Sequence, residues 1–172
     1  KKSGTPTMGG VLIIVAVTVS SLLLSDGYSV LPYALFVIIG FGLIGLIDDF
    51  IIVTTKRSLG LKARHKLVGQ ILVAAVLALY MINESPLGAS IMIPFKGTVT
   101  VLPPWLFLVL AVATVVGSAN AVNFTDGLDG LAAGASAVTM VVYAIIAHSF
   151  GSTELTVLAA AVTGACLGFC WF

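Results

Sequence analysis

The sequence predicts an all-α, polytopic integral membrane bundle of about six transmembrane helices, with a small external β-hairpin. Of its 172 residues, 59% are hydrophobic and 9% are charged, and the mean hydropathy is +1.18. Soluble domains have about 45–50% apolar and about 25% charged residues. The net charge of +1 provides no basic surface for nucleic acid. These figures exclude a soluble enzyme, a disordered tail and a nucleic-acid-binding protein, and leave membrane lipid as the expected surroundings.

Six apolar segments approach the length of about 20 residues that a membrane-spanning helix needs. The predicted spans are residues 9–25, 30–51, 67–82, 105–122, 131–147 and 155–172. Buried core helices are the alternative, but six such segments in series leave no polar shell to cover them. The third span is short, so we expect Arg64 and Lys66 to extend from its start toward lipid headgroups.

Residues 83–104 do not have a helical pattern. Two β-prone runs, at 90–94 and 98–102, flank Phe95, Lys96 and Gly97, a pattern typical of a hairpin. Seven of the eight basic residues lie in the N-terminal segment or the 52–66 loop, and only Lys96 lies in a loop of opposite parity. The positive-inside rule therefore predicts a cytoplasmic N-terminus and cytoplasmic 52–66 and 117–130 loops.

The ends of the chain indicate part of a longer protein. There is no initiator Met or signal-peptide pattern, and the last residues continue an apolar run. We therefore expect residues 1–172 to form a single membrane domain that is an internal fragment of a longer membrane protein. Cys166 and Cys170 share one helix face and are expected to be packed small hydrophobes rather than a metal pair or a disulfide.

The acidic residues provide the first candidate site. Asp48 and Asp49 follow the apolar run 41–47, which places two adjacent carboxylates at the membrane interface. Adjacent carboxylates repel each other unless a cation compensates them, and Mg²⁺ combines one or two carboxylates with water and substrate phosphates. The alternative is an ordinary solvated helix end.

Three further polar stretches are predicted to lie on the same side of the membrane. Residues 120–130 concentrate Asn, Thr and Asp between two spans, and residues 1–10 combine Lys, Thr and Gly before a helix, as phosphate-binding entries do. An ordinary helix connection and an ordinary interface segment are the respective alternatives. Residues 62–67 are most simply a lipid-headgroup anchor. Together these stretches favour phosphoryl-transfer chemistry at a membrane surface.

Four motifs in this order resemble one enzyme family. Residues 2–10, 45–50, 66–70 and 120–132 are similar to the phospho-N-acetylmuramoyl-pentapeptide-transferases, in the polyprenyl-phosphate N-acetylhexosamine-1-phosphate transferase superfamily. The resemblance implies transfer of phospho-MurNAc-pentapeptide from UDP-MurNAc-pentapeptide to undecaprenyl phosphate, with release of UMP and a requirement for Mg²⁺. It also implies a bacterial cytoplasmic (inner) membrane location, a cytoplasmic active site, about ten helices in the complete protein and a homodimer.

The resemblance also implies roles for individual residues. Asp48 and Asp49 match the catalytic acidic pair, as a base toward the lipid phosphate or as a covalent nucleophile, and are candidate Mg²⁺ ligands. The expected substrate-binding residues are Lys1, Thr5, Thr7, Asn123, Asp126, Asp129, Lys56 and Lys66.

The sequence departs from the family pattern in two ways. Ile52 stands where the family usually has a lysine, and Lys56 is the nearest substitute. The chain also lacks the later Gly-Asp-x-Gly-Ser loop, with its expected Mg²⁺ ligand, and the histidine-rich loop. We therefore expect this fragment to be inactive alone. The alternatives are a sibling transferase that uses UDP-N-acetylglucosamine and, in another class, an ion-coupled transporter.

Overall fold

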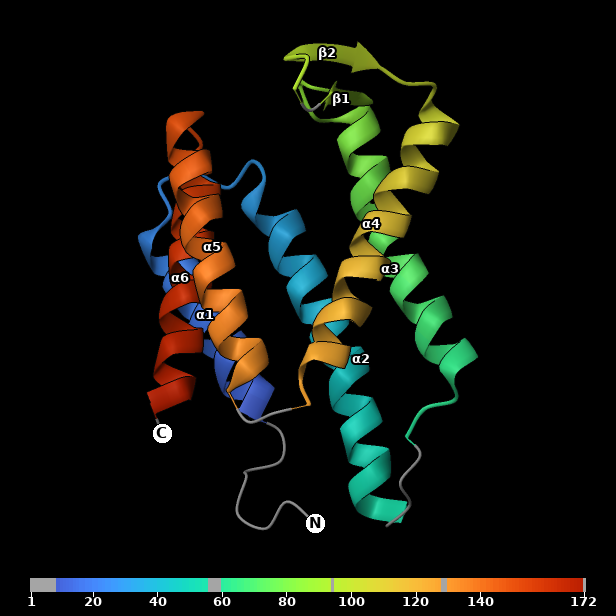
Figure 1. Ribbon diagram of the computed structural model, residues 1–172, viewed down its shortest axis with the longest axis vertical. Coiled ribbons are helices and arrows are strands. Elements are labelled where there is room, and N and C mark those ends of the chain that lie inside the picture. Colours follow the sequence, from blue (N-terminus) through green and yellow to red (C-terminus); the bar gives the residue numbers. More distant parts are fainter. Residues whose placement is uncertain (1–8, 56–59, 94, 128–129, 172) are drawn as a thin grey trace.

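The computed structural model describes residues 9–55, 60–93, 95–127 and 130–171, which form a bundle of six helices with one two-stranded sheet (Figure 1). The elements are α1 (Gly9–Leu24), α2 (Leu31–Thr55), α3 (Ala63–Asn83), β1 (Ser90–Ile93), β2 (Thr98–Val101), α4 (Pro104–Thr125), α5 (Leu131–Ser149) and α6 (Thr153–Trp171). The predicted all-α polytopic membrane bundle with a small hairpin is confirmed.

The helices have the length and composition of membrane spans. Five of the six described helices are long and apolar enough to cross a membrane, whereas α1 has 16 residues and is shorter. A helix satisfies its backbone hydrogen bonds internally, as the hydrocarbon requires. Large apolar side chains such as Leu23, Leu72 and Val138 are exposed, while the small residues Ala74 and Ala137 are buried between helices. This inverted pattern is typical of helices that pack against each other through small residues and face lipid elsewhere.

Two helix ends differ from the predicted spans. The third helix begins at Ala63 rather than near residue 67, so Arg64 and Lys66 lie within its first turns. The second helix continues past residue 51 to Thr55, so Asp48 and Asp49 lie inside it. In both cases charged residues end the apolar run without ending the helix, because Lys, Arg and an isolated acidic pair tolerate helical geometry.

The two cysteines differ in their surroundings. Cys166 is buried in α6, as expected for a small packed hydrophobe, whereas Cys170 is exposed in the last turns of the same helix. Its Sγ lies 3.8 Å from the carbonyl oxygen of Gly130. The expectation of packing is therefore confirmed for Cys166 and wrong for Cys170, which follows Cys166 by one turn and lies at the end of the helix.

The helices form two groups. Helix α6 packs against α5 and α1, while α3 packs against α2 and α4 (Figure 1). Helices α4 and α5 are joined by a short connection, yet they contact each other at few positions. The end of α4 therefore belongs to one group and the start of α5 to the other.

Successive helices run in opposite directions, which gives the bundle two distinct ends (Figure 1). The C-terminal end of α2, which carries Asp48, shares one end with the start of α3, the end of α4 and the start of α5. We call this the Asp48 end. The other end carries the sheet and is called the hairpin end.

The strands β1 and β2 pair antiparallel, with Ser90 opposite Val101 and Ile93 opposite Thr98. Phe95 and Gly97 have φ angles of 66° and 63°, and reversal of the chain between the strands uses these left-handed conformations. The hairpin predicted around residues 95–97 is therefore confirmed.

Close packing holds α2 between its neighbours. A Cβ atom added at Gly40 would lie 3.0 Å from both methyl carbons of Val73 on α3, and one at Gly42 would overlap Ile14 on α1. At Gly69 on α3, the same atom would lie 3.2 Å from Ile44 Cδ1. Glycine at these positions lets the helix backbones approach closely. The position of Asp48 is therefore determined by packing on both sides of α2.

At the hairpin end, the Glu154 carboxylate caps the start of α2. Oε1 accepts hydrogen bonds from the backbone N–H of Ser29 (3.1 Å) and from its hydroxyl (2.6 Å). Oε2 accepts from the N–H groups of Val30 and Leu31, both at 2.8 Å. The first turn of a helix has N–H groups without intrahelical partners, and a carboxylate satisfies them. Glu154 therefore ties α6 to α2. We call this contact the Glu154 cap.

Candidate functional site

The Asp48 end gathers the predicted site residues that the structure describes. Asp48 and Asp49 come from α2, Lys66 from α3, and Asn123 and Asp126 from the end of α4. The remaining predicted substrate-binding residues lie outside the described part of the chain; they are Lys1, Thr5, Thr7, Lys56 and Asp129. Two of the sequence motifs, the acidic pair and the Asn/Asp run, are thus at one end of the bundle, as predicted.

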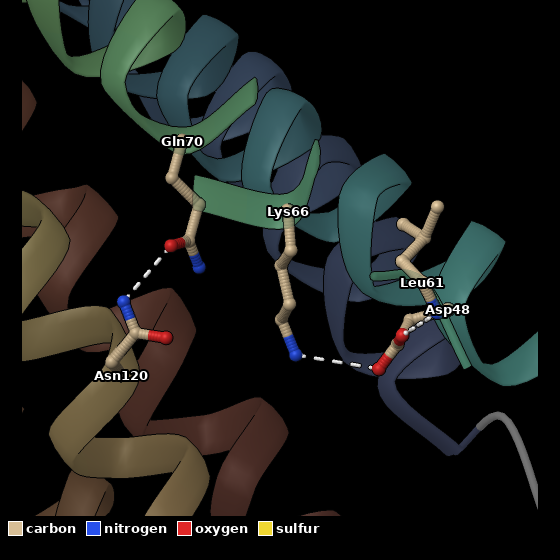
Figure 2. A network of polar contacts seen from close by, with 5 residues as sticks. All are labelled: Asp48, Leu61, Lys66, Gln70 and Asn120. Atoms are coloured by element: carbon tan, nitrogen blue, oxygen red, sulfur yellow. Dashed lines mark hydrogen bonds and ion pairs between the residues drawn. The ribbon is translucent and has the colours of Figure 1, made fainter. Parts of the chain in front are cut away.

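Both carboxylate oxygens of Asp48 are engaged, one by Leu61 just before α3 and the other by Lys66 in its first turns (Figure 2). Oδ1 accepts a 2.7 Å hydrogen bond from the backbone N–H of Leu61, and Oδ2 lies 3.3 Å from Lys66 Nζ. Each of the two charged side chains is 20% exposed. Because partial burial weakens screening by water, this pair interacts more strongly than an exposed surface pair. Asp48 therefore fixes the segment that enters α3 and aligns Lys66 with it.

The residue before Leu61 must be small for this bond to form. A Cβ atom on Gly60 would overlap Asp48 Oδ1 and would lie 2.9 Å from the Asp48 carbonyl oxygen. Only a residue without a side chain lets the backbone approach α2 this closely. Gly60 is thus part of the geometry that holds Asp48, although the sequence alone gave no reason to select it.

Asp49 differs from its neighbour in exposure and in contacts. It is exposed, and among the described residues its carboxylate has neither a hydrogen bond nor an ion pair. It adjoins Asp48 on α2, and Asp48 is paired with Lys66 of α3, so charges of both signs lie nearby. The Asp49 carboxylate is therefore open to a ligand, next to an ion pair between α2 and α3.

Asn123 and Asp126 lie at the last turns of α4, and both are exposed. The backbone N–H of Asp126 still donates to the Val122 carbonyl oxygen at 3.2 Å, so the helical hydrogen bonding extends to this residue. Asn123 and Asp126 therefore lie at the same end of the bundle as the acidic pair of α2.

An amide pair next to this cluster was missed by the residue-level sequence predictions. Asn120 Nδ2 on α4 donates a 2.9 Å hydrogen bond to Gln70 Oε1 on α3 and a 2.8 Å bond to the Val116 carbonyl oxygen. Gln70 is only 5% exposed. Gln70 lies four residues after Lys66 in a mostly apolar helix. This spacing places the two polar side chains on one helix face and could have indicated a role for Gln70. Figure 2 shows the amide pair and the Lys66–Asp48 pair side by side along α3.

The basic stretch at the start of α3 divides into two parts. Lys62, Arg64 and His65 are exposed, which agrees with an anchor for lipid headgroups. Lys66, predicted to extend toward headgroups, instead turns to Asp48. The reason is helical geometry, since Lys66 lies on the same face as Gln70, the face that packs within the bundle.

The acidic groups suit a metal ion that keeps water or phosphate ligands. Within the described ranges, no three His, Cys, Asp or Glu side chains are grouped closely enough to form a protein cage for a metal. Mg²⁺ needs only one or two carboxylates when water and phosphates complete its shell. The Asp48–Asp49 pair has that number, with Asp49 as the less engaged member, so the donor set fits this kind of ion.

Comparison with known proteins identifies the family. The family model of glycosyl transferase family 4 matches residues 31–172, which include every helix of the site. The chain belongs to glycosyl transferase family 4. Residues 2–14 separately match the phospho-N-acetylmuramoyl-pentapeptide-transferase signature 1. The predicted resemblance is therefore confirmed at the level of the family. The signature overlaps residues 1–10, the stretch that combines Lys, Thr and Gly before the first helix.

Individual relatives are similar to this protein along its whole chain. A phospho-N-acetylmuramoyl-pentapeptide-transferase of Halalkalibacterium halodurans is 45% identical over 176 residues, which cover 100% of this chain and 54% of the relative. Relatives of the same name from Desulforamulus reducens and Clostridioides difficile are each 43% identical, covering 99% of this chain and 53% of the relative. The chain thus spans about half the length of these curated relatives.

Proposed function

We propose that the protein transfers phospho-MurNAc-pentapeptide from UDP-MurNAc-pentapeptide to undecaprenyl phosphate, and releases UMP. The observation that supports this most directly is the similarity to phospho-N-acetylmuramoyl-pentapeptide-transferases along the whole chain, including signature 1 over residues 2–14. The cluster of Asp48, Asp49, Lys66 and Asp126 at one end of a membrane bundle supports it independently. Such a cluster suits a reaction between a lipid phosphate and a water-soluble nucleotide.

The different states of the two aspartates suggest different roles. Asp48 has both oxygens engaged by Leu61 and Lys66, so it organises the site. Asp49 is the carboxylate that we propose acts on substrate, either as the base toward the lipid phosphate or as a nucleophile. Phosphoryl transfer depends chiefly on positioning and on neutralisation of charge. Lys66, held beside Asp48, supplies positive charge for that purpose.

We propose that Mg²⁺ binds at the acidic pair, with Asp49 as the main ligand from the described residues and Asp48 as the second candidate. When bound, such an ion would neutralise charge on the substrate phosphates. Asn123 and Asp126 are proposed to contact the nucleotide substrate, together with five residues outside the described ranges. Those five are Lys1, Thr5, Thr7, Lys56 and Asp129.

We further propose that residues 1–172 are an internal piece of a longer transferase, in line with their coverage of about half of each relative. The proposed location is the bacterial cytoplasmic (inner) membrane, with the Asp48 end facing the cytoplasm. A homodimer stays a prediction. Measuring the protein mass of the full-length protein in detergent micelles would test it, because a dimer has twice the mass of one chain.

The transfer reaction is tested with the full-length protein that contains these residues, reconstituted in nanodiscs with undecaprenyl phosphate and Mg²⁺. We expect UMP release and a phospho-MurNAc-pentapeptide lipid, identified by mass spectrometry, with UDP-MurNAc-pentapeptide as donor. A product with UDP-N-acetylglucosamine alone would contradict the proposed donor, and no product with either would contradict the reaction. Residues 1–172 alone are expected to form no product, and turnover by them would contradict the proposal that they are an incomplete piece.

The membrane orientation is tested with single cysteines in a background in which Cys166 and Cys170 are replaced by serine. Lys62→Cys at the Asp48 end and Lys96→Cys at the hairpin end are both at exposed positions. In intact cells, a membrane-impermeant maleimide should label residue 96 and not residue 62. The reverse labelling pattern would contradict the proposed orientation.

A further inference from the structure

Gln70 is a buried polar side chain between two helices of the site. It is 5% exposed, and within the described part of the chain only Ser21 is another buried polar residue. Its Oε1 accepts the hydrogen bond from Asn120 Nδ2, and Asn120 also donates to its own helix at Val116 (Figure 2). The amide pair is therefore a specific bridge between α3 and α4.

Packing alone does not call for an amide at this position. The other buried residues of α3 are Ala74 and Ala78, and small apolar residues are sufficient for close contact between membrane helices. A buried amide costs free energy unless it is hydrogen-bonded, so the pair permits only arrangements of α3 and α4 in which its bond forms. The bond therefore fixes how the two helices are placed along and around their axes.

The placement matters because both helices carry site residues close to the bridge. Lys66 precedes Gln70 by one helical turn and contacts Asp48. Asn123 and Asp126 follow Asn120 by about one and two turns, and helical hydrogen bonding continues to Asp126. Asp49, Lys66 and Asp126 all lie at the Asp48 end of the bundle. A shift of α4 against α3 would thus change the position of Asn123 and Asp126 relative to Asp49.

We propose that Gln70 is a positioning residue, which acts through Asn120 to hold the Asn123–Asp126 turn at a set distance from Asp49. This inference rests on the proposed function, in which that turn contacts the nucleotide substrate. Loss of the bridge should therefore weaken nucleotide binding more than it slows the reaction at Asp49. It should leave the KM for undecaprenyl phosphate unchanged.

The bridge is tested with a double-mutant cycle in the full-length protein, using Gln70→Met, Asn120→Leu and both together. These side chains keep approximate volume and remove the hydrogen bond. Each single variant should raise the KM for the nucleotide substrate by roughly threefold to twentyfold, with a smaller change in kcat. The KM of the double variant should be no higher than that of the single variant with the higher KM, because the same hydrogen bond is lost in all three. Exchange of the two residues, Gln70→Asn with Asn120→Gln, should recover part of the loss.

A matched control separates positioning from general packing. Phe107→Leu removes buried contact area from α4 near the hairpin end and should lower the Tm while leaving the nucleotide KM unchanged. If Gln70→Met behaves in the same way as Phe107→Leu, or if the effects of the two single variants add in the double variant, the positioning role is wrong.

A distance measurement makes the test independent of activity. Spin labels at Arg64 on α3 and Phe124 on α4, two exposed positions, report the separation of the two helices at the Asp48 end. Gln70→Met should broaden or shift this distance distribution, and Phe107→Leu should not. If the wild-type protein shows no transfer but the distribution changes, the proposed function fails and the bridge stands. If transfer occurs but neither the KM nor the distribution responds to Gln70→Met, the bridge fails alone.

Discussion

The two ends of the bundle use carboxylates in different ways. At the hairpin end, the two oxygens of Glu154 accept from three backbone N–H groups and one hydroxyl. At the Asp48 end, Asp48 has one N–H donor and one ammonium partner, while Asp49 has no partner among the described residues. A carboxylate whose oxygens are occupied by the protein is suited to holding structure, whereas a pair with an open member is suited to holding a ligand.

The difference follows from where each acid lies on its helix. Glu154 meets the start of α2, where N–H groups lack intrahelical partners and a negative charge is favoured. Asp48 and Asp49 lie within α2, whose N–H groups are already used by helical hydrogen bonds. Their oxygens must therefore find donors elsewhere. Among the residues that the structure describes, Asp48 reaches such donors at Leu61 and Lys66, and Asp49 does not.

The largest expected effect on transfer comes from Asp49→Asn in the full-length protein. It replaces the open carboxylate with a neutral group of the same size, and should lower the transfer rate by roughly 10²-fold or more. The measurement is UMP release with equal amounts of folded protein. Asp26→Asn, the same change at an exposed position of the hairpin end, is the control and should keep full activity. Equal activity of the two variants would remove the proposed distinction between the ends.

Lys66→Met should have the next largest effect, a loss of roughly tenfold to 100-fold in kcat/KM. It removes the cation paired with Asp48, so that, among the described residues, Asp48 keeps the Leu61 N–H alone and its negative charge beside Asp49 is no longer compensated. Lys66→Arg should recover part of the activity because it keeps the charge. Lys62→Met removes an exposed cation from the start of the same helix and should change the rate less than twofold. A loss with Lys62→Met as large as with Lys66→Met would mean that general charge, rather than the ion pair, is what matters.

Gly60→Ala tests the backbone side of the same contact. The added methyl group would overlap Asp48 Oδ1, so the Leu61 hydrogen bond should break and kcat/KM should fall by about tenfold. Gly164→Ala on α6 has no atom within 4 Å of the added carbon and serves as the control. Steady-state kinetics of both variants measure the effect. Unchanged kinetics for Gly60→Ala would show that this contact is dispensable.

Glu154→Gln should have the smallest effect on transfer and a clear effect on stability. In Gln one carboxylate oxygen is replaced by an NH2 group, which cannot accept hydrogen bonds from the backbone N–H groups. The loss of these bonds should lower the free energy of unfolding by about 1–3 kcal/mol. Thermal unfolding in detergent measures this, with Asp26→Asn as the control that should keep the wild-type Tm. Activity per folded molecule should change less than twofold. A large loss of activity at an unchanged Tm would reverse the comparison between the two ends.

Several elements could be predicted from local sequence because the membrane imposes local rules. Apolar runs locate the helices, since each span must satisfy its own backbone hydrogen bonds. The turn residues Phe95 and Gly97 locate the hairpin. The side on which the acidic pair and the Asn/Asp run lie follows from counting spans. Helix ends were less well predicted, as for α3. A charged residue such as Arg64 interrupts the apolar run by which a span is recognised, but the helix itself continues through it.

The contacts within the site depend on residues that are distant in the sequence. Nothing near Asp48 indicates that Leu61 and Lys66 will occupy its two oxygens, or that Gln70 will meet Asn120 fifty residues later. These contacts arise from how α2, α3 and α4 pack, which glycines such as Gly69 permit. The distinction between an engaged Asp48 and an open Asp49 is likewise a matter of which face of α2 meets α3.

Composition, hydropathy and motif order alone thus define a membrane bundle with an acidic site at one end, because the hydrocarbon acts on each segment separately. Packing of the helices assigns a structural role to Glu154, an anchored state to Asp48 and an open state to Asp49. The physical reason is that a hydrogen bond or ion pair depends on distances of a few ångströms between helices, and no single segment specifies those distances.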